Sequence, residues 1–185
     1  MLKSLARIIL TLLGWRLLDP PQRPARAVVV GYPHTSNWDA LYGQLGKLAL
    51  GLNARWVGKD NLFRWPFAGL LRRLGGIPVD RRAPHGFVDQ MAAQFAAQPE
   101  FLLVMAPEGT RRLTDGWKSG FYRIALAAGV PLILTTVDYA RREVGILAYL
   151  EPSGDPEADI ATIAAHYAGR QGRNPALASP IRWLG

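Results

Sequence analysis

Residues 27–39 read Ala27-Val28-Val29-Val30-Gly31-Tyr32-Pro33-His34-Thr35-Ser36-Asn37-Trp38-Asp39 and join an apolar run to a polar turn. The run of valines has the composition of a buried strand, and the small polar residues after the histidine are of the kind that begin helices. Strand and helix patterns alternate along the rest of the chain as well, as they do in α/β proteins. We therefore predict a single α/β domain with a mixed, largely parallel central sheet that is flanked by helices.

His34 and Asp39 are the candidate catalytic residues of this stretch. A carboxylate that binds one imidazole nitrogen fixes the tautomer and leaves the other nitrogen free to take a proton. The chain offers no serine or cysteine nucleophile to complete a triad, so a substrate hydroxyl would have to give up the proton. Ser36 and Asp39 also fit a capping box, in which the carboxylate stabilises a first helical turn without any role in catalysis.

A second polar turn follows another apolar run. Residues 101–106 have the pattern of a buried strand, and Pro107-Glu108-Gly109-Thr110-Arg111 come directly after it. In open α/β sheets, ligands bind beyond the carboxyl ends of the strands. Both polar turns therefore lie where a functional site is expected.

The spacing His34-x4-Asp39 followed by Glu108-Gly109-Thr110-Arg111 resembles the glycerolipid acyltransferase family, which includes 1-acylglycerol-3-phosphate acyltransferases. Further blocks resemble that family in the same order across residues 34–133. They are Lys59-x-x-Leu62-Phe63-x-x-Pro66-x-x-Gly69, then Gly76-Ile77-Pro78-Val79-Asp80-Arg81, and finally Gly129-Val130-Pro131-Leu132-Ile133. The sequence departs from the family at Pro33, where many members have an asparagine before the histidine.

The resemblance implies an enzyme of phospholipid biosynthesis. Such an enzyme transfers a fatty acyl group from an acyl thioester to the free hydroxyl of a lysophospholipid acceptor, here most simply 1-acylglycerol-3-phosphate. The donor is acyl-CoA or acyl carrier protein, and neither a metal nor another cofactor is expected. His34 would be the general base and Asp39 its orienting partner, as in hydrolase triads. Because acceptor and donor are bound together, no acyl-enzyme is required.

Three basic residues are candidates for binding the acceptor's phosphate. Arg111 closes the second turn, where its planar guanidinium could bind a phosphate through two hydrogen bonds. Arg81 lies in the stretch that resembles the family's phosphate-binding region, although a simple pair with Asp80 or a solvated loop would also explain it. Lys59 fits the family's second block.

Glu108, Gly109 and Thr110 complete the candidate substrate-binding turn. Glu108 is negatively charged, so a direct contact with a phosphate is unfavourable. We expect its carboxylate to hold the loop by accepting hydrogen bonds from backbone amides, or to accept one from a substrate hydroxyl.

Composition agrees with an anionic membrane surface as partner but does not single it out. Lys and Arg total 22 against 14 Asp and Glu, which gives a net charge of +8. Such a charge attracts anionic lipid and nucleic acid alike, but no nucleic-acid-binding module is legible, and we expect no nucleic-acid partner. The absence of cysteine excludes disulfides and thiolate metal sites, and it suits a reducing compartment.

The first 18 residues form an amphipathic pattern. Only eight residues, Ile8 to Trp15, run without a charge, far short of the roughly 20 that span a bilayer. We predict that residues 1–18 form a helix lying in the membrane interface on the cytoplasmic side, followed by an acyltransferase domain over residues 19–185. A helix packed on the protein's own core is the alternative. The predicted polar face holds Lys3, Ser4, Arg7 and Thr11.

The remaining pattern predicts alternating strands and helices. The repeats of Phe87, Met91 and Phe95 and of Phe121, Ile124 and Ala125 predict two helices with buried apolar faces, the second ending at Gly129. No pattern is interpretable from Arg170 onward. The other predicted helices are 39–52, 62–74 with an interruption at Pro66, and 159–167, and the other predicted strands are 55–58, 132–137 and 144–150.

Other classes of function fit less well. The stretch Gly116-Trp117-Lys118-Ser119-Gly120 has its serine one place too late for the nucleophile elbow of a serine hydrolase. The chain has no G-x-x-x-x-G-K-[ST] phosphate loop. A basic peripheral membrane protein that binds anionic lipid without catalysis stays open as the alternative to an acyltransferase.

Overall fold

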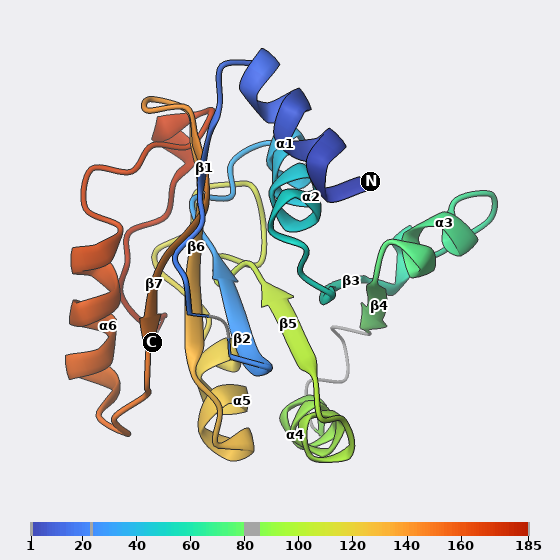
Figure 1. Ribbon diagram of the computed structural model, residues 1–185. Helices are drawn as coiled ribbons and strands as arrows, with labels where there is room; N and C mark the ends of the chain where they lie inside the picture. The colour runs from blue at the N-terminus through green and yellow to red at the C-terminus, as the bar shows by residue number, and fades with distance from the viewer. Residues whose placement is uncertain (1, 23, 80–85, 185) are drawn as a thin grey trace.

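The computed structural model describes residues 2–22, 24–79 and 86–184. A seven-stranded sheet with the strand order β1-β7-β6-β2-β5-β3-β4 forms its centre (Figure 1). The helices are α1 (Leu2–Leu12), α2 (Trp38–Leu50), α3 (Ala68–Arg73), α4 (Phe87–Ala97), α5 (Gly120–Ala128) and α6 (Pro156–His166), with 3-10 turns η1 (Asp60–Leu62) and η2 (Pro175–Leu177). The strands are β1 (Arg16–Leu18), β2 (Arg26–Gly31), β3 (Ala54–Lys59), β4 (Gly76–Val79), β5 (Phe101–Met105), β6 (Leu132–Asp138) and β7 (Glu143–Leu150).

The sheet is mixed and largely parallel, as predicted. β2 pairs in parallel with β5 and β6, and β3 pairs in parallel with β5 and β4. Within the part of the chain that is described, β6 and β7 form the one antiparallel pair, and β1 adds in parallel to β7 at the far edge. The carboxyl ends of β2, β3, β4 and β5 consequently meet at one edge of the sheet, where a ligand site is expected.

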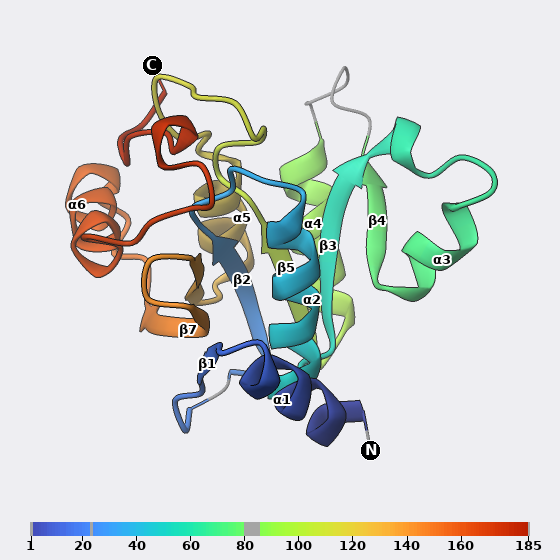
Figure 2. The same cartoon turned by 90° about the horizontal axis from the view of Figure 1, so that it is seen from above.

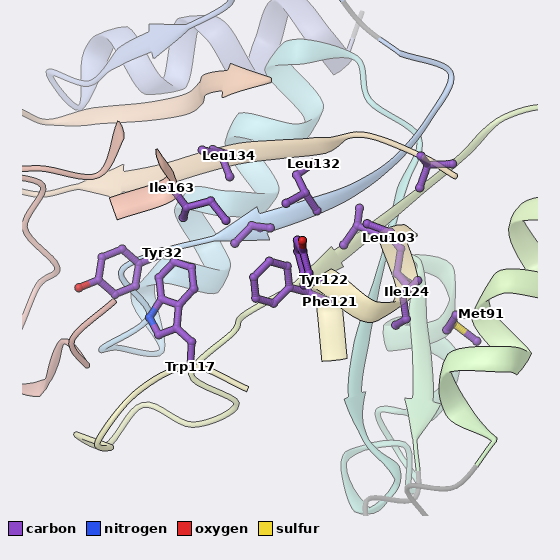
Figure 3. Close-up of a cluster of buried hydrophobic side chains, with 14 of the residues drawn as sticks. Tyr32, Met91, Leu103, Trp117, Phe121, Tyr122, Ile124, Leu132, Leu134 and Ile163 are labelled. Carbon is purple, nitrogen blue, oxygen red and sulfur yellow. The ribbon is translucent and has the colours of Figure 1, made fainter. Parts of the chain in front are cut away.

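The valine run forms the central strand because both of its faces are covered. Side chains alternate across a strand, so Val28 and Val30 join the core under α4 and α5, while Ala27 and Val29 join the core under α2. Figure 2 shows α2 on one side of the sheet, with α4 and α5 on the other. Figure 3 shows the larger core, in which Leu103, Leu132 and Ile124 pack together. Full burial of one such side chain contributes about 1.5–3 kcal/mol.

Most of the predicted helices are present. Met91 and Phe95 on α4 and Phe121, Ile124 and Ala125 on α5 are buried, as their spacing predicts. Helix α5 ends at Gly129, whose φ of 59° places it in the left-handed region that closes helices.

The prediction of a helix over residues 62–74 is wrong in its first half. Only Ala68–Arg73 is α-helical, and the chain before it forms the η1 turn and an irregular loop. Pro66 has no amide hydrogen to donate, and in a helix its ring would clash with a backbone carbonyl of the preceding turn. Strands β1 and β4 were not predicted, because one has only three residues and the other contains Pro78.

The amino-terminal helix is shorter than the predicted 18 residues. Helix α1 ends at Leu12, and Arg16–Leu18 pair with β7 as β1. Ala6 and Leu10 are buried against α2, so one face of α1 packs on the protein. Among the described residues, no helix has the length and apolar character needed to cross a membrane. The opposite side of the segment leaves five large apolar side chains exposed, namely Leu2, Leu5, Ile8, Leu12 and Leu13.

Candidate active site

The loop between β2 and α2 brings His34 and Asp39 together. Nδ1 of His34 lies 3.4 Å from Oδ2 of Asp39. The carboxylate side chain is 4% exposed and the imidazole 24% exposed. Since Nδ1 faces the carboxylate, Nε2 is the nitrogen left to meet a substrate.

The carboxylate of Asp39 is fixed by several donors. Oδ2 accepts hydrogen bonds from the amides of Thr35 at 2.7 Å and Ser36 at 2.8 Å, and Oδ1 accepts one from the hydroxyl of Tyr139 at 2.9 Å. Burial would raise the pKa of Asp39, but the hydrogen bonds from His34, Ser36, Tyr139 and Thr35 outweigh it and hold that pKa below its usual value. Asp39 is therefore a charged partner for the imidazole.

The helix-capping contact of Asp39 and its contact with His34 occur together. Asp39 accepts the Ser36 amide at the start of α2, which is the carboxylate's half of a capping box. Oγ of Ser36 accepts the amide of Trp38 at 3.2 Å. The same carboxylate thus stabilises the start of the helix and contacts His34. Measuring activity and stability on the same variant would separate the capping role from the catalytic one.

Tyr139 is a site residue that sequence analysis missed. It follows Asp138, the last residue of β6, and its ring packs edge-on against Trp15 and Tyr42. Burial, followed by the hydrogen bond to Asp39, raises the pKa of Tyr139. The hydroxyl consequently keeps its proton and donates a hydrogen bond to Asp39. The two residues are 100 positions apart, so no local pattern could pair them.

Replacing Tyr139 by phenylalanine is expected to lower kcat about tenfold, because a hydrogen bond to a charged group contributes about 1.5–3 kcal/mol. The acceptor KM should change little, since the tyrosine orients Asp39 and is not expected to contact substrate. Steady-state kinetics across a pH series would measure both effects. Tyr42→Phe removes a hydroxyl from the same aromatic cluster and is the matched control; equal kcat and pH profiles for the two variants would contradict a positioning role.

Glu108 lies behind the histidine loop. The side chain is fully buried, and its Oε1 accepts the backbone amide of His34 at 3.4 Å. Its Oε2 has no hydrogen-bond partner among the described residues. Burial raises the pKa of Glu108 to about 8, although hydrogen bonds from the amides of His34 and Ser179 lower it in part. Glu108 therefore links the two polar turns and is largely protonated near neutral pH.

A further cation, Lys118, lies against the Glu108 turn. Gly109 has a φ of 66°, and a Cβ built on it would lie 3.3 Å from Cδ of Lys118. The Lys118 side chain thus lies against the turn, and the positive φ of Gly109 is the backbone conformation that favours glycine there. Sequence analysis treated Lys118 only as part of a failed serine motif.

The other predicted binding residues are Thr110 and Arg111 on the Glu108 turn, Lys59 at the end of β3, and Arg81. Arg111 is exposed at the end of the turn, and Oγ1 of Thr110 accepts the amide of Arg112 at 3.3 Å. Lys59 is the last residue of β3, at the same edge of the sheet as the two turns. Arg81 lies outside the described residues. The binding roles of these residues stay predictions.

The carboxyl-terminal tail, in which sequence analysis found no pattern, packs on the site. Nδ2 of Asn174 donates to the carbonyl of Thr35 at 2.9 Å, and the backbone amide of Asn174 donates to Oγ1 of Thr35 at 3.2 Å. The hydroxyl of Tyr32 donates to the carbonyl of Ser179 at 3.0 Å. The tail therefore holds the loop that carries His34.

Comparisons with known proteins agree with this arrangement. Residues 19–137 match the family model described as Acyltransferase. Over 97 residues the chain is 33% identical to the 1-acyl-sn-glycerol-3-phosphate acyltransferase of Escherichia coli (strain K12), a match that covers 49% of this chain and 39% of that enzyme. The fold is similar to the crystal structure of the 1-acyl-sn-glycerophosphate acyltransferase PlsC from Thermotoga maritima, with a TM-score of 0.58 and 18% identity over 89% of this chain and 74% of that one. Because the family model spans more than half of the chain and includes both polar turns, this chain belongs to the acyltransferase family.

Proposed function

We propose that this protein transfers a fatty acyl group from an acyl thioester to the free hydroxyl of a lysophospholipid, with 1-acylglycerol-3-phosphate as the first candidate acceptor. The observation that carries the proposal is the imidazole of His34, whose Nδ1 faces a buried, charged Asp39. In the same loop, the hydroxyl oxygens of Ser36 and Thr35 accept the backbone amides of Trp38 and Asn174 and so help to hold the loop. The proposed proton donor to Nε2 of His34 is the hydroxyl of the substrate.

The transfer follows from this geometry. His34 removes the proton of the acceptor hydroxyl as the oxygen attacks the thioester carbonyl. The tetrahedral intermediate then expels the thiolate, which takes the proton back from the imidazolium, so that ester and free thiol are the products. Asp39 stabilises the imidazolium between the two steps. A general base contributes about 10²–10⁴-fold, and holding both substrates in place supplies much of the remaining rate.

The choice of acceptor rests on charge and on relatives. The chain has a net charge of +8, and Arg111 is exposed next to the turn that contacts the His34 loop. The Escherichia coli and Thermotoga maritima relatives are named for the phosphate-bearing acceptor. A phosphate bound by Arg111 would hold the glycerol hydroxyl near His34.

The proposed setting is the cytoplasmic surface of an anionic membrane. The apolar side chains that α1 and the turn after it leave exposed, Leu2, Leu5, Ile8, Leu12 and Leu13, are available for the lipid interface. Lys3 belongs to the same helix and carries charge that anionic head groups attract, whereas Arg7 is engaged within the protein, where it pairs with Asp19 and donates to the carbonyl of Ala49. The donor is then a water-soluble carrier, coenzyme A or acyl carrier protein, that approaches from the cytoplasm.

Turnover with labelled donor tests the function directly. Acyl-CoA and acyl carrier protein, each labelled in the acyl chain, are incubated with the protein and 1-acylglycerol-3-phosphate, and lipids are separated by chromatography. The expected product is labelled diacylglycerol phosphate. Release of labelled fatty acid without acceptor would indicate a hydrolase, and lipid binding without any product would favour the non-catalytic peripheral protein.

Arg111→Lys is expected to raise the acceptor KM about tenfold or more while the donor KM stays constant, because the variant keeps the charge but loses two-point binding of phosphate. Steady-state kinetics with each substrate varied in turn would measure this. Arg112→Lys is the matched control, since it changes the neighbouring exposed arginine. An unchanged acceptor KM for Arg111→Ala would remove Arg111 from the binding site.

A further inference from the structure

The segment from Leu62 to Leu74 stands away from the body of the protein. It joins β3 to β4 at the edge of the sheet and contains the short helix α3. In both views α3 projects outward, and the amino-terminal end of α1 is the end of that helix nearer to it (Figures 1 and 2). We refer to residues 62–74 as the projecting segment.

One aromatic side chain anchors the projecting segment. Phe63 is buried and stacks on Trp56 of β3 with ring centroids 5.7 Å apart. A Cβ on Gly76 of β4 would lie only 2.7 Å from the Phe63 ring, so the glycine makes room for this anchor. At the other end, Nζ of Lys47 and Nε1 of Trp56 both donate to the carbonyl of Leu74. The segment is thus fixed to the sheet at both ends.

The other large apolar side chains of the segment face solvent. Trp65 is 92% exposed, which is the highest value among the exposed large hydrophobic side chains, and Phe67 is 63% exposed. Indole and phenyl rings prefer the interface between water and lipid, and soluble proteins seldom present them together at a projecting loop. The remaining exposed members of the group are Leu62, Leu70 and Leu74.

The charge of the segment is uniformly positive. Arg64, Arg72 and Arg73 are exposed among the apolar side chains, and the sequence has no acidic residue between Asn61 and Val79. The guanidinium of Arg72 also lies over the Phe63 ring, 5.9 Å from its centroid. Aromatic rings beside arginines match a surface that is apolar within and negatively charged at its boundary, which describes an anionic bilayer.

We propose that the projecting segment docks on an anionic lipid bilayer by inserting Trp65 and Phe67 while Arg64 and Arg73 contact the head groups. This contact is separate from α1 and deepens the proposed function, because it names a second surface through which the enzyme meets the membrane that holds its acceptor. A second copy of the chain is a poorer partner. A two-fold contact through this segment would bring two sets of three arginines together without any acidic residue of the segment to offset them.

Vesicle flotation tests the apolar part of the contact. The full chain and Trp65→Ser/Phe67→Ser are mixed with vesicles that contain phosphatidylglycerol and phosphatidylcholine. The double variant is expected to partition at least about tenfold more weakly, because two interfacial aromatic anchors are lost. Leu126→Ser, which removes an exposed leucine of α5, is the control and should bind as the wild type does. Binding by the double variant equal to that of the wild type would overturn the proposal.

Charge variants test the second part and do not depend on the folding of the first variant. Arg64→Gln and Arg73→Gln are each expected to weaken binding about fivefold on these vesicles and to have no effect on vesicles of phosphatidylcholine alone. Arg123→Gln on α5, also exposed, is the control. Equal losses for all three variants would show attraction by net charge alone and overturn a contact through this segment.

Two further measurements separate the remaining explanations. Size-exclusion chromatography would reveal a dimer, and a dimer that Trp65→Ser/Phe67→Ser dissociates without loss of vesicle binding would replace the bilayer by a second copy of the chain. Turnover on detergent-dispersed acceptor is expected to survive in the double variant. If the wild type itself shows no turnover while the vesicle results are as expected, the proposed function fails and the docking surface stands.

Discussion

Replacing His34 by alanine is expected to reduce acyl transfer by about 10²–10⁴-fold, the usual contribution of a general base. The protein should stay folded. The imidazole is partly exposed, and the contact that ties the loop to Glu108 is made by the backbone amide of residue 34, which alanine retains. Initial rates with labelled donor and thermal melting of the same preparation would measure both. Near-normal turnover by well-folded His34→Ala would refute the proposed mechanism.

Asp39→Asn separates catalysis from helix capping in the same loop. The asparagine oxygen can still accept the amides of Thr35 and Ser36, and the new NH2 group can donate to the oxygen of Tyr139, which accepts as well as donates. Asp39 lies in the first turn of α2, where loss of a negative charge costs about 0.3–1 kcal/mol, so melting should change little. The negative charge that stabilises imidazolium is lost, and turnover should fall severely. Normal turnover would leave Asp39 with a capping role alone.

The second large effect is expected in the pH dependence of stability, from the buried carboxyl of Glu108. Its pKa is about 8 in the folded protein, against an ordinary value of 4.5. Between these values the unfolded chain has lost this proton while the folded chain keeps it. The contribution of Glu108 to the free energy of unfolding is therefore fully present below pH 4.5 and is lost as the pH rises through 8. The full loss corresponds to about 5 kcal/mol, from 3.5 pH units at 1.36 kcal/mol each.

Glu108→Gln is the direct measurement of this effect, because glutamine is neutral at every pH and keeps an oxygen for the His34 amide. Chemical unfolding of both proteins from pH 5 to pH 9 gives the difference in free energy of unfolding. The advantage of the variant over the wild type should be small at pH 5 and reach its full size at pH 9. Other titrating groups cancel in the difference. Parallel curves for the two proteins would contradict a buried carboxyl that resists ionisation.

The sequence was sufficient for the fold class and for the expectation that His34, Asp39 and Glu108 lie close together. A run such as Ala27–Val30 excludes an amphipathic surface strand and fits only a strand that is covered on both faces, as β2 is. Since parallel strands end at a common edge, the turns after β2 and β5 were expected to meet, and the amide of His34 does donate to Glu108. Local spacing also placed Asp39 within reach of His34. The two residues are five positions apart, one in the loop after β2 and the other in the first turn of α2.

Only the tertiary structure decided which distant residues complete the site. Tyr139, Asn174 and Ser179 approach the two turns from the end of β6 and from the tail, more than 70 residues away in sequence. Their contacts depend on strand order and on the path of the tail, which local sequence periodicity does not predict. The surface of the 62–74 segment was undecided for the same reason: an apolar pattern does not reveal whether a neighbour covers it. Phe63 has such a neighbour in Trp56, while Trp65 remains 92% exposed.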